Sequence, residues 1–357
     1  MTPIIDEIFK QQHRAEGRAN ALVDEILEAL TASLENLTAK LVALQVRFLS
    51  AQPWEQESLQ RKKGFLEAQR AAVEEAINDA YESKASALLT AAQDTMTYVQ
   101  AETASLGLAN RLAFEVGSLH LDLDTVTAWA QVTTIDGLTM TEWLKRMARH
   151  TADKIVQAGR ESIIQGLTVR QMAKLLRQRG IEGSRPAIES LARTYLISAS
   201  NYAREQSIEG LGADLDFKWQ YVATLDGRTC IMCGVDDGKI YKKDDKRPSL
   251  PRHINCRCTY IPVFDETLDD ATRPAVKHNE RTVQHRDGST STKYTVDSVD
   301  HLPAQETYRQ WMERQIKEDP AFVQQVLGKT RFELFQKGQL PLKKMVLDGK
   351  IKKLSNT

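Results

Sequence analysis

Apolar residues recur at a helical period over the first hundred residues of the chain. Between residues 23 and 48 they are spaced alternately by four and three positions, a 3.5-residue repeat that is typical of a coiled-coil seam. Pro53 ends this run, because proline lacks an amide donor and disfavours helix in the residue before it. A second amphipathic run follows from about residue 55 to residue 102. The first stripe consists of Val23, Leu27, Leu30, Leu34, Leu37, Leu41, Leu44 and Phe48, and the second of Leu66, Val73, Ile77, Ala80, Leu88, Ala92, Met96 and Val99.

Residues 1–105 are therefore predicted to form a long, coiled-coil-like helical hairpin. Two interpretations of the hairpin are open, and both can hold at once. The two stripes can bury each other in an antiparallel pair, or the hairpin can be an extended arm for oligomerisation or for docking to a partner.

Residues 106–212 are predicted to be a helical subdomain. Amphipathic helices are expected over residues 141–165, 169–179 and 184–209, and Thr168 is a suitable N-cap for the second of them. This spacing could form a helix–turn–helix that contacts DNA. No recognition pattern of Asn, Gln and Arg is evident, so a packed subdomain with a solvated basic face is favoured. The basic residues in question are Arg170, Lys174, Arg177 and Arg179.

The hydrophobic period changes to two after residue 212. Phe217, Trp219 and Tyr221 alternate along a predicted strand at residues 217–224, so they should share one face of a sheet. Two further strands are expected at residues 239–242 and 256–264, with turn signals between them.

The chain as a whole is predicted to be α+β and mainly helical. A small, zinc-stapled β module should occupy residues 213–266. An exposed, polar connection should follow at residues 267–303, and it could include a hairpin with one strand at residues 293–296. A basic helical tail is expected at residues 304–357.

The charge balance adds to this picture. The chain of 357 residues has 48 Lys+Arg and 48 Asp+Glu, so its net charge of zero excludes a uniformly basic nucleic-acid binder. Residues 271–357 nevertheless carry 16 basic and 10 acidic residues, so this tail could contact phosphates non-specifically. No apolar run is long enough for a membrane span and no secretory signal begins the chain. Folding in a reducing cytosol is expected.

All four cysteines fall within 29 residues, in the pattern Cys230-x2-Cys233 and then His253-x2-Cys256-x-Cys258. Such clustering in a cytosolic protein favours a metal site over disulfides. Zinc prefers four tetrahedral ligands drawn from thiolate and imidazole, and its binding would supply folding free energy to a module with a small core. Five candidates exist for four positions. We favour Cys230, Cys233, His253 and Cys256, with Cys258 as an alternative ligand or a buried thiol.

Two other interpretations of this cluster are weighed against a structural zinc site. A catalytic zinc would need an open coordination position and a nearby base, for which Asp226, Asp236 and Asp237 are candidates, but three cysteine ligands disfavour it. The alternative is a set of metal-free thiols, or of disulfides formed after release from a cell.

The residues around the cysteines resemble a known family. The run Asp226-Gly-Arg-Thr-Cys-x2-Cys, then Asp237-Gly-Lys-Ile-Tyr, then Pro251-x-His-x2-Cys-Arg-Cys is similar to the phage head morphogenesis domain of the minor head protein family typified by protein F of phage Mu. The aromatic strand before this run, the helix before that strand and segments of the C-terminal tail fit as well. The resemblance extends over roughly residues 150–350.

The resemblance implies a non-catalytic minor capsid protein of a tailed phage. Such a protein would be made in the host cytoplasm and located in the virion, at the portal vertex of the head. Its implied partners are the portal protein and other head proteins, in multiple copies around the portal, together with packaged DNA in weak, non-specific contact. Its implied role is head morphogenesis, with a part in DNA packaging or ejection. A metal-dependent nuclease and a DNA-binding protein are the alternatives.

Overall fold

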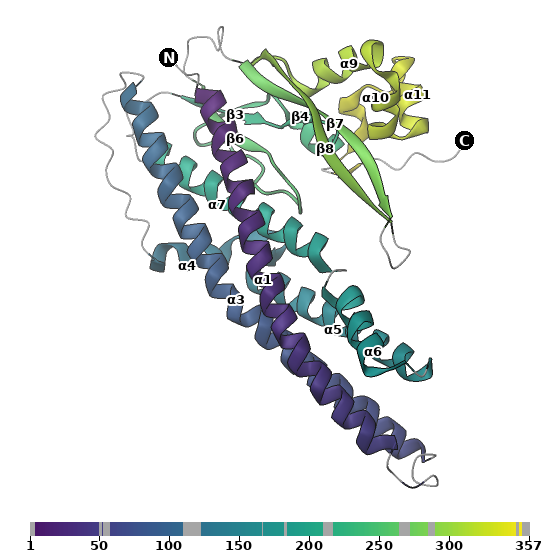
Figure 1. Ribbon diagram of the computed structural model, residues 1–357. Helices are drawn as coiled ribbons and strands as arrows, with labels where there is room; N and C mark the ends of the chain where they lie inside the picture. Colours follow the sequence, from purple (N-terminus) through teal and green to yellow (C-terminus); the bar gives the residue numbers. More distant parts are fainter. Residues whose placement is uncertain are drawn as a thin grey trace.

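The fold is α+β and mainly helical, as the sequence predicts (Figure 1). Within the described part of the chain, no helix is long and apolar enough to cross a membrane. The computed structural model describes residues 4–49, 52, 58–109, 123–165, 167–181, 184–209, 217–263, 272–284, 290–347 and 350–351. The helices before residue 210 are α1 (Ile4–Leu49), α3 (Leu59–Ala109), α4 (Leu123–Val132), α5 (Met140–Ile164), α6 (Val169–Leu176), the π-helical turn η1 (Arg177–Ile181) and α7 (Arg185–Glu209).

The predicted hairpin is formed by α1 and α3, which lie antiparallel (Figure 1). Both predicted stripes are buried, apart from the half-buried Leu44. The side chains of Phe48 and Leu66, and Pro53 as a whole, lie outside the described residues. The two stripes bury each other and also pack on α5 and α7, so that one hydrophobic core runs from Ala15 in α1 to Ala203 in α7. The core therefore continues across residue 105, where the sequence suggested a boundary.

The three predicted helices of the central subdomain are present as α5, α6 and α7. Thr168 caps α6 as expected, and it forms a capping box with Gln171. The α-helix ends at Leu176, earlier than predicted, and continues as the π-helical turn η1. A short β-hairpin, β1 (Thr134–Ile135) and β2 (Leu138–Thr139), precedes α5.

The predicted β module contains a three-stranded antiparallel sheet in the order β5-β3-β6. The predicted aromatic stripe of Phe217, Trp219 and Tyr221 is buried on one face, together with Tyr260 and three of the cysteines. The elements of this region are β3 (Lys218–Val222), β4 (Leu225–Asp226), α8 (Ile231–Asp236), β5 (Ile240–Lys242) and β6 (Thr259–Val263).

The segment that was predicted as an exposed connection is more regular than expected. Strands β7 (Thr272–Gln284) and β8 (Thr290–Pro303) form a long antiparallel hairpin, and β4 pairs in parallel with the start of β7. The base of the hairpin is anchored by Arg273, whose buried guanidinium donates to the Asp237 carboxylate and to the backbone oxygen of Glu306. The turn-rich residues 285–289 lie outside the described residues.

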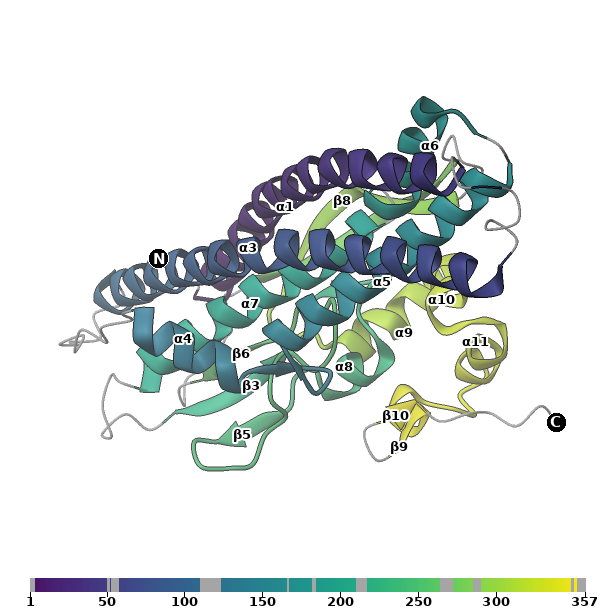
Figure 2. The ribbon, with the colours of Figure 1, turned by 90° about the horizontal axis from the view of Figure 1, so that it is seen from below.

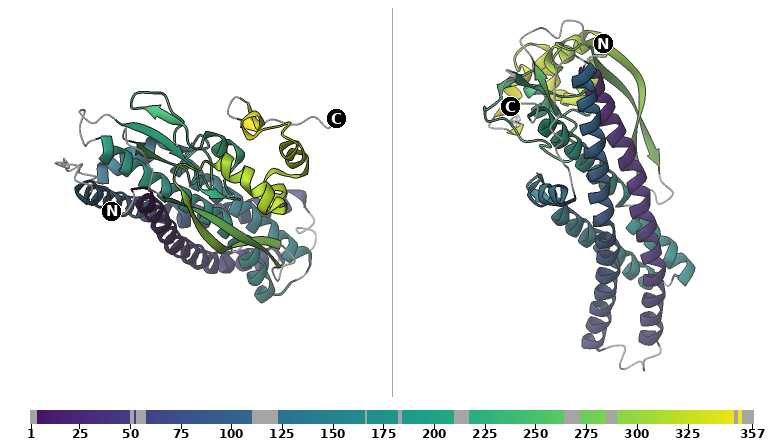
Figure 3. Two further views of the ribbon diagram at one scale, coloured as in Figure 1. Left: turned by 90° about the horizontal axis from the view of Figure 1, so that it is seen from above. Right: turned by 90° about the vertical axis from the view of Figure 1, so that its left-hand side faces the viewer.

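The C-terminal region is helical, as predicted, and has a core of its own around Trp311, Met312 and Phe335. It lies at the end of the molecule opposite the end of α1 and the beginning of α3 (Figure 3, right). Its elements are α9 (Tyr308–Glu318), α10 (Pro320–Leu327), α11 (Lys329–Gln336), the 3-10 turn η3 (Leu342–Met345), β9 (Val346–Leu347) and β10 (Lys350–Ile351).

Candidate metal centre

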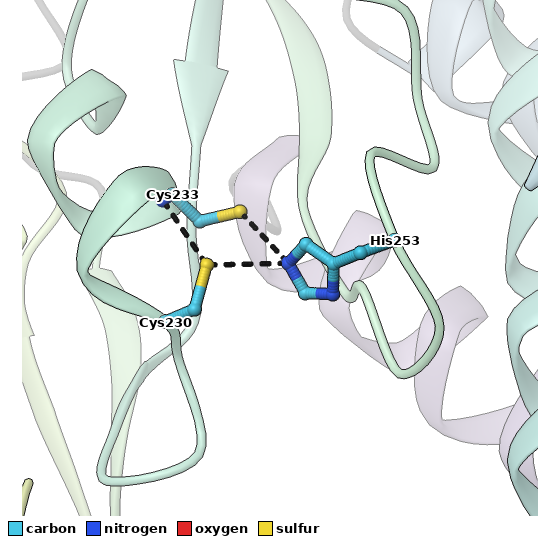
Figure 4. A group of neighbouring side chains, drawn as sticks. All are labelled: Cys230, Cys233 and His253. Atoms are coloured by element: carbon cyan, nitrogen blue, oxygen red, sulfur yellow. Dashed lines mark hydrogen bonds between the residues drawn. The ribbon is translucent and has the colours of Figure 1, made fainter. Parts of the chain in front are cut away.

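The first pair of candidate ligands sits at the start of α8. Cys230 is the N-cap of this helix, and its Sγ accepts the backbone N–H of Cys233 at 3.4 Å. This hydrogen bond turns both sulfur atoms towards the same space (Figure 4). It also favours a thiolate at Cys230, because an amide at the beginning of a helix stabilises negative charge. The sequence predicted the knuckle but not the helix that follows it.

His253 enters the same space from the loop between β5 and β6. The loop is fixed on both sides: the backbone N–H of Asn255 donates to Thr194 Oγ1 in α7 at 2.8 Å, and that of Ile254 donates to Asp136 Oδ2 at 3.2 Å. His253 Nδ1 lies 2.8 Å from the backbone oxygen of Ile254. A proton on Nδ1 completes this hydrogen bond and leaves Nε2 as the electron-pair donor, the arrangement usual for a metal-bound histidine.

The distances among these three side chains suit a tetrahedral metal site. His253 Nε2 lies 3.2 Å from Cys230 Sγ and 3.4 Å from Cys233 Sγ (Figure 4). Ligand atoms around a tetrahedral zinc, with bonds of about 2.0–2.3 Å, are separated by roughly 3.5 Å. The residues present therefore fit a zinc ion in both donor chemistry and spacing.

Cys256 and Cys258, which directly precede strand β6, complete the cluster. Their sulfur atoms and that of Cys233 form a second group, in which all donor atoms lie within 4.8 Å of one another, as they do in the group of Cys230, Cys233 and His253. Cys233 belongs to both groups, so all five predicted ligands converge around it. The first group contains neither of the two alternatives for the fourth ligand and the second contains both, so the preference for Cys256 stays a prediction. All four cysteines are free thiols, which leaves no disulfide among them.

Mutual hydrogen bonding polarises the cluster. A hydrogen bond from Cys233, assisted by His253, lowers the pKa of Cys230 to about 4. The hydrogen bond with Cys230 raises the pKa of His253 to about 9. The chain without metal therefore holds a thiolate beside an imidazolium at neutral pH, and a cation that displaces this proton finds a preformed sulfur donor.

The three carboxylates that could have served as a catalytic base are all engaged in ion pairs. Asp226 accepts both terminal nitrogens of Arg257, and Asp237 accepts those of Arg273. Asp236 is paired with Lys239 and Arg252. These side chains hold the module together, and each is committed to a cation other than a metal.

Several residues that position the cluster were not singled out from the sequence. Asn201 in α7 donates to the backbone oxygen of Cys258, and Gln12 in α1 donates to that of Arg257. Arg257 itself lies within the Cys-Arg-Cys motif, and its partner Asp226 begins the Asp-Gly-Arg-Thr-Cys run. The motif thus contained a signal for this ion pair, whereas nothing in the sequence marks Gln12, Thr194 or Asn201.

The basic residues of the predicted helix–turn–helix lie on α6 and η1. Met172 and Leu176 pack into the main core, as expected for a packed subdomain. The four basic side chains are exposed. The lysines of the C-terminal tail that could contact phosphates are Lys343, Lys344, Lys350, Lys352 and Lys353. Lys343 and Lys344 are exposed, whereas the side chain of Lys350, and Lys352 and Lys353 as a whole, lie outside the described residues.

The part of the chain that contains the Cys/His cluster is similar to a known protein family. The family described as Phage Mu protein F like protein matches residues 153–261. A comparison with curated proteins gave no match, and a comparison with solved structures gave none either. The matched segment begins within α5, ends within β6 and contains all five Cys and His ligand candidates. The match agrees with the resemblance seen in the sequence: residues 153–261 are similar to the family described as Phage Mu protein F like protein.

Proposed function

We propose that the chain is a non-catalytic minor head protein of a tailed phage, which acts in head morphogenesis at the portal vertex and in the packaging or ejection of DNA. The observation that carries this proposal is the family match over residues 153–261, which encloses the Cys/His cluster and the helices that support it. The protein would be made in the host cytoplasm and reside in the virion, in multiple copies around the portal.

In this proposal the cluster binds one structural Zn²⁺ through four of its five candidates, with Cys230, Cys233, His253 and Cys256 preferred. The donor types and their spacing support zinc. The location of the cluster supports a structural role, because it joins α8 to the His253 loop and to the start of β6, three segments that share only a small core. Bound zinc would supply cohesion there.

The shape of the molecule supports docking to a ring-like partner such as the portal. The far end of the α1–α3 hairpin extends beyond the rest of the fold, away from the β module and the C-terminal helices (Figures 1 and 3). Because the base of the hairpin shares a core with α5 and α7, a partner held at its far end would be connected rigidly to the family domain.

The alternative of a metal-dependent nuclease is disfavoured by the state of the nearby carboxylates. Asp226 and Asp237 are buried and each accepts a bidentate arginine. A general base needs to reach a water molecule at the metal, and these side chains are already committed. A nuclease would show cleavage that is lost in Asp226→Ala with zinc retained.

Co-purification of the tagged chain with the portal protein, expressed together, tests the portal assignment. The proposal predicts a complex that survives gel filtration and is lost when the hairpin end is altered by Ala43→Glu with Ala71→Glu, two exposed positions on facing helices. A matched pair of changes on the C-terminal helices, Arg309→Glu with Lys337→Glu, should leave the complex intact. Failure of the chain to bind portal, or equal loss in both variants, would contradict it.

A further inference from the structure

One face of α6 carries only basic charge. Arg170 and Lys174 in α6 and Arg177, the C-cap of α6 with helical backbone angles, follow one another at intervals of four and three residues, so they lie on the same side of the helix, and all three are exposed. The opposite side packs Met172 and Leu176 into the core. We call these three residues the α6 basic face. Helix α6 lies at the outer edge of the helical bundle, beside α1 (Figures 1 and 2).

The α6 basic face has no internal counter-charge among the described residues. No carboxylate of the described chain forms an ion pair with any of the three side chains, whereas the neighbouring Arg179 is paired with Glu161 at 3.4 Å. The stretch of sequence that includes the face is basic as a whole: residues 140–181 contain nine Lys+Arg and three Asp+Glu, a net charge of +6. The zero net charge of the whole chain therefore does not apply to this segment.

This arrangement is unfavourable for the isolated helix. Like charges three and four residues apart repel each other, and Arg170 lies in the first turn, where the helix dipole disfavours a cation, whereas the dipole favours Lys174 in the last turn. The helix nevertheless holds Arg170, Lys174 and Arg177 in a row with no acidic residue between them. An external anion would remove the repulsion.

We infer that the α6 basic face binds the phosphate backbone of duplex DNA without regard to sequence. This inference rests on the proposed function, since duplex DNA is the abundant polyanion inside a phage head. The three cations extend over about 10 Å of helix axis, at 1.5 Å per residue, which is the length along the duplex axis of about three phosphates of one strand. The face offers donors and cations only, as phosphate contacts require.

The composition of the face favours DNA over an acidic protein partner. Protein interfaces have a desolvated centre that is enriched in aromatic and apolar side chains. The exposed residues of α6 are polar, since Arg170, Gln171 and Lys174 are exposed while Met172 and Leu176 are buried. A purely cationic, solvated strip suits a partner that is recognised by charge.

Fluorescence anisotropy with labelled 30-base-pair duplexes tests this inference on the full chain. The comparison uses wild type, the variant R170Q/K174Q/R177Q and a control variant K218Q/K242Q/K246Q. The control removes the same charge from three exposed lysines of the β module, to which no phosphate contact is assigned. Binding is measured between 50 and 200 mM salt with two unrelated duplex sequences.

Wild type should bind both duplexes equally, and its affinity should fall steeply with salt. Loss of three phosphate contacts lowers the slope of log affinity against log salt by about 2.7. Over this fourfold range of salt, wild type should thus lose about 40-fold more affinity than the α6 variant. The control should keep the wild-type slope. The melting temperature of the α6 variant should stay close to that of wild type, since the relief of like-charge repulsion is offset by the loss of a cation from the last turn of the helix.

Three outcomes would overturn the inference. The first is a wild-type slope in the α6 variant, and the second is an equal loss in the α6 and control variants. The third is unchanged DNA binding in the α6 variant with loss of its complex with an acidic head protein, which would make the face a protein-docking surface. The assay uses only purified chain and duplex, so its failure is distinguishable from absence of the chain from phage heads.

Discussion

Arg257 donates both terminal guanidinium nitrogens to the buried carboxylate of Asp226, at 2.6 and 2.7 Å. Asp226 precedes Cys230 by four residues, and Arg257 lies between Cys256 and Cys258. The ion pair therefore joins the two segments that supply the cysteine ligands. Asp226 also accepts the backbone N–H groups of two residues in the turn that leads to Cys230, which fixes the entry to the knuckle.

Replacement of Asp226 by Asn should be strongly destabilising. The amide oxygen can still accept the backbone N–H groups, but Arg257 would be left as a largely buried charge without a partner, at a cost of about 3 kcal/mol in the free energy of unfolding. Urea denaturation of zinc-loaded protein measures this cost. A matched control is Glu313→Gln, which removes an exposed carboxylate 4.0 Å from Arg309 and should cost well under 1 kcal/mol. Equal effects of the two changes would contradict the linking role.

Removal of single cysteines should identify the zinc ligands. Purified chain is expected to contain one zinc per molecule by mass spectrometry of the metal, and a strong chelator should lower its melting temperature. Cys230→Ser, Cys233→Ser and Cys256→Ser should lose zinc, because each removes a thiolate from the preferred set. Cys258→Ser should retain it. Loss of zinc from Cys258→Ser with retention in Cys256→Ser would exchange the roles of the two residues, and absence of zinc from wild type would contradict a zinc site altogether.

Helices α8 and α9 can pack closely because residue 234 is a glycine, which has no side chain. A Cβ atom added at Gly234 would lie 2.3 Å from Cδ1 of Tyr308, a fully buried residue at the start of α9. Gly234→Ala should therefore force α8 and α9 apart and destabilise the protein by about 1–3 kcal/mol.

A second glycine provides the control for this prediction. Gly159 lies inside α5, where an added Cβ would meet nothing within 4 Å. Gly159→Ala should stabilise the protein by about 0.5–1 kcal/mol, since alanine loses less conformational freedom in a helix. Thermal unfolding should move in opposite directions for the two variants. A shift in the same direction would show that the Tyr308 contact does not limit residue 234.

The sequence predicted those features that depend on local periodicity. The stripes of α1 and α3, the Thr168 cap and the aromatic face of β3 all follow from the spacing of side chains along one segment. The β7–β8 hairpin was largely missed, because β7 contains Pro274 and lacks apolar alternation. Its base depends on pairing with β4, which lies about fifty residues earlier in the chain.

The candidate site also has a part that could be predicted from the sequence and a part that could not. The five Cys and His residues were found from their spacing, and the structure brings them together. The side chains that hold the His253 loop in place come from distant segments. Thr194 accepts a hydrogen bond from Asn255, 61 residues away, and Asp136 accepts one from Ile254, 118 residues away. Such contacts are determined by how α7 and the β1–β2 turn pack in the folded chain, and single-sequence patterns carry no information about them.

The central claim, that the chain is a structural protein of the phage head, is tested most directly by its location. Particles of a phage that encodes the chain can be purified, separated into heads and tails, and quantified for this chain against the major capsid protein. A few copies of the chain are expected per head, retained in heads that contain the portal and reduced in heads assembled without it. Absence of the chain from purified heads would contradict the account.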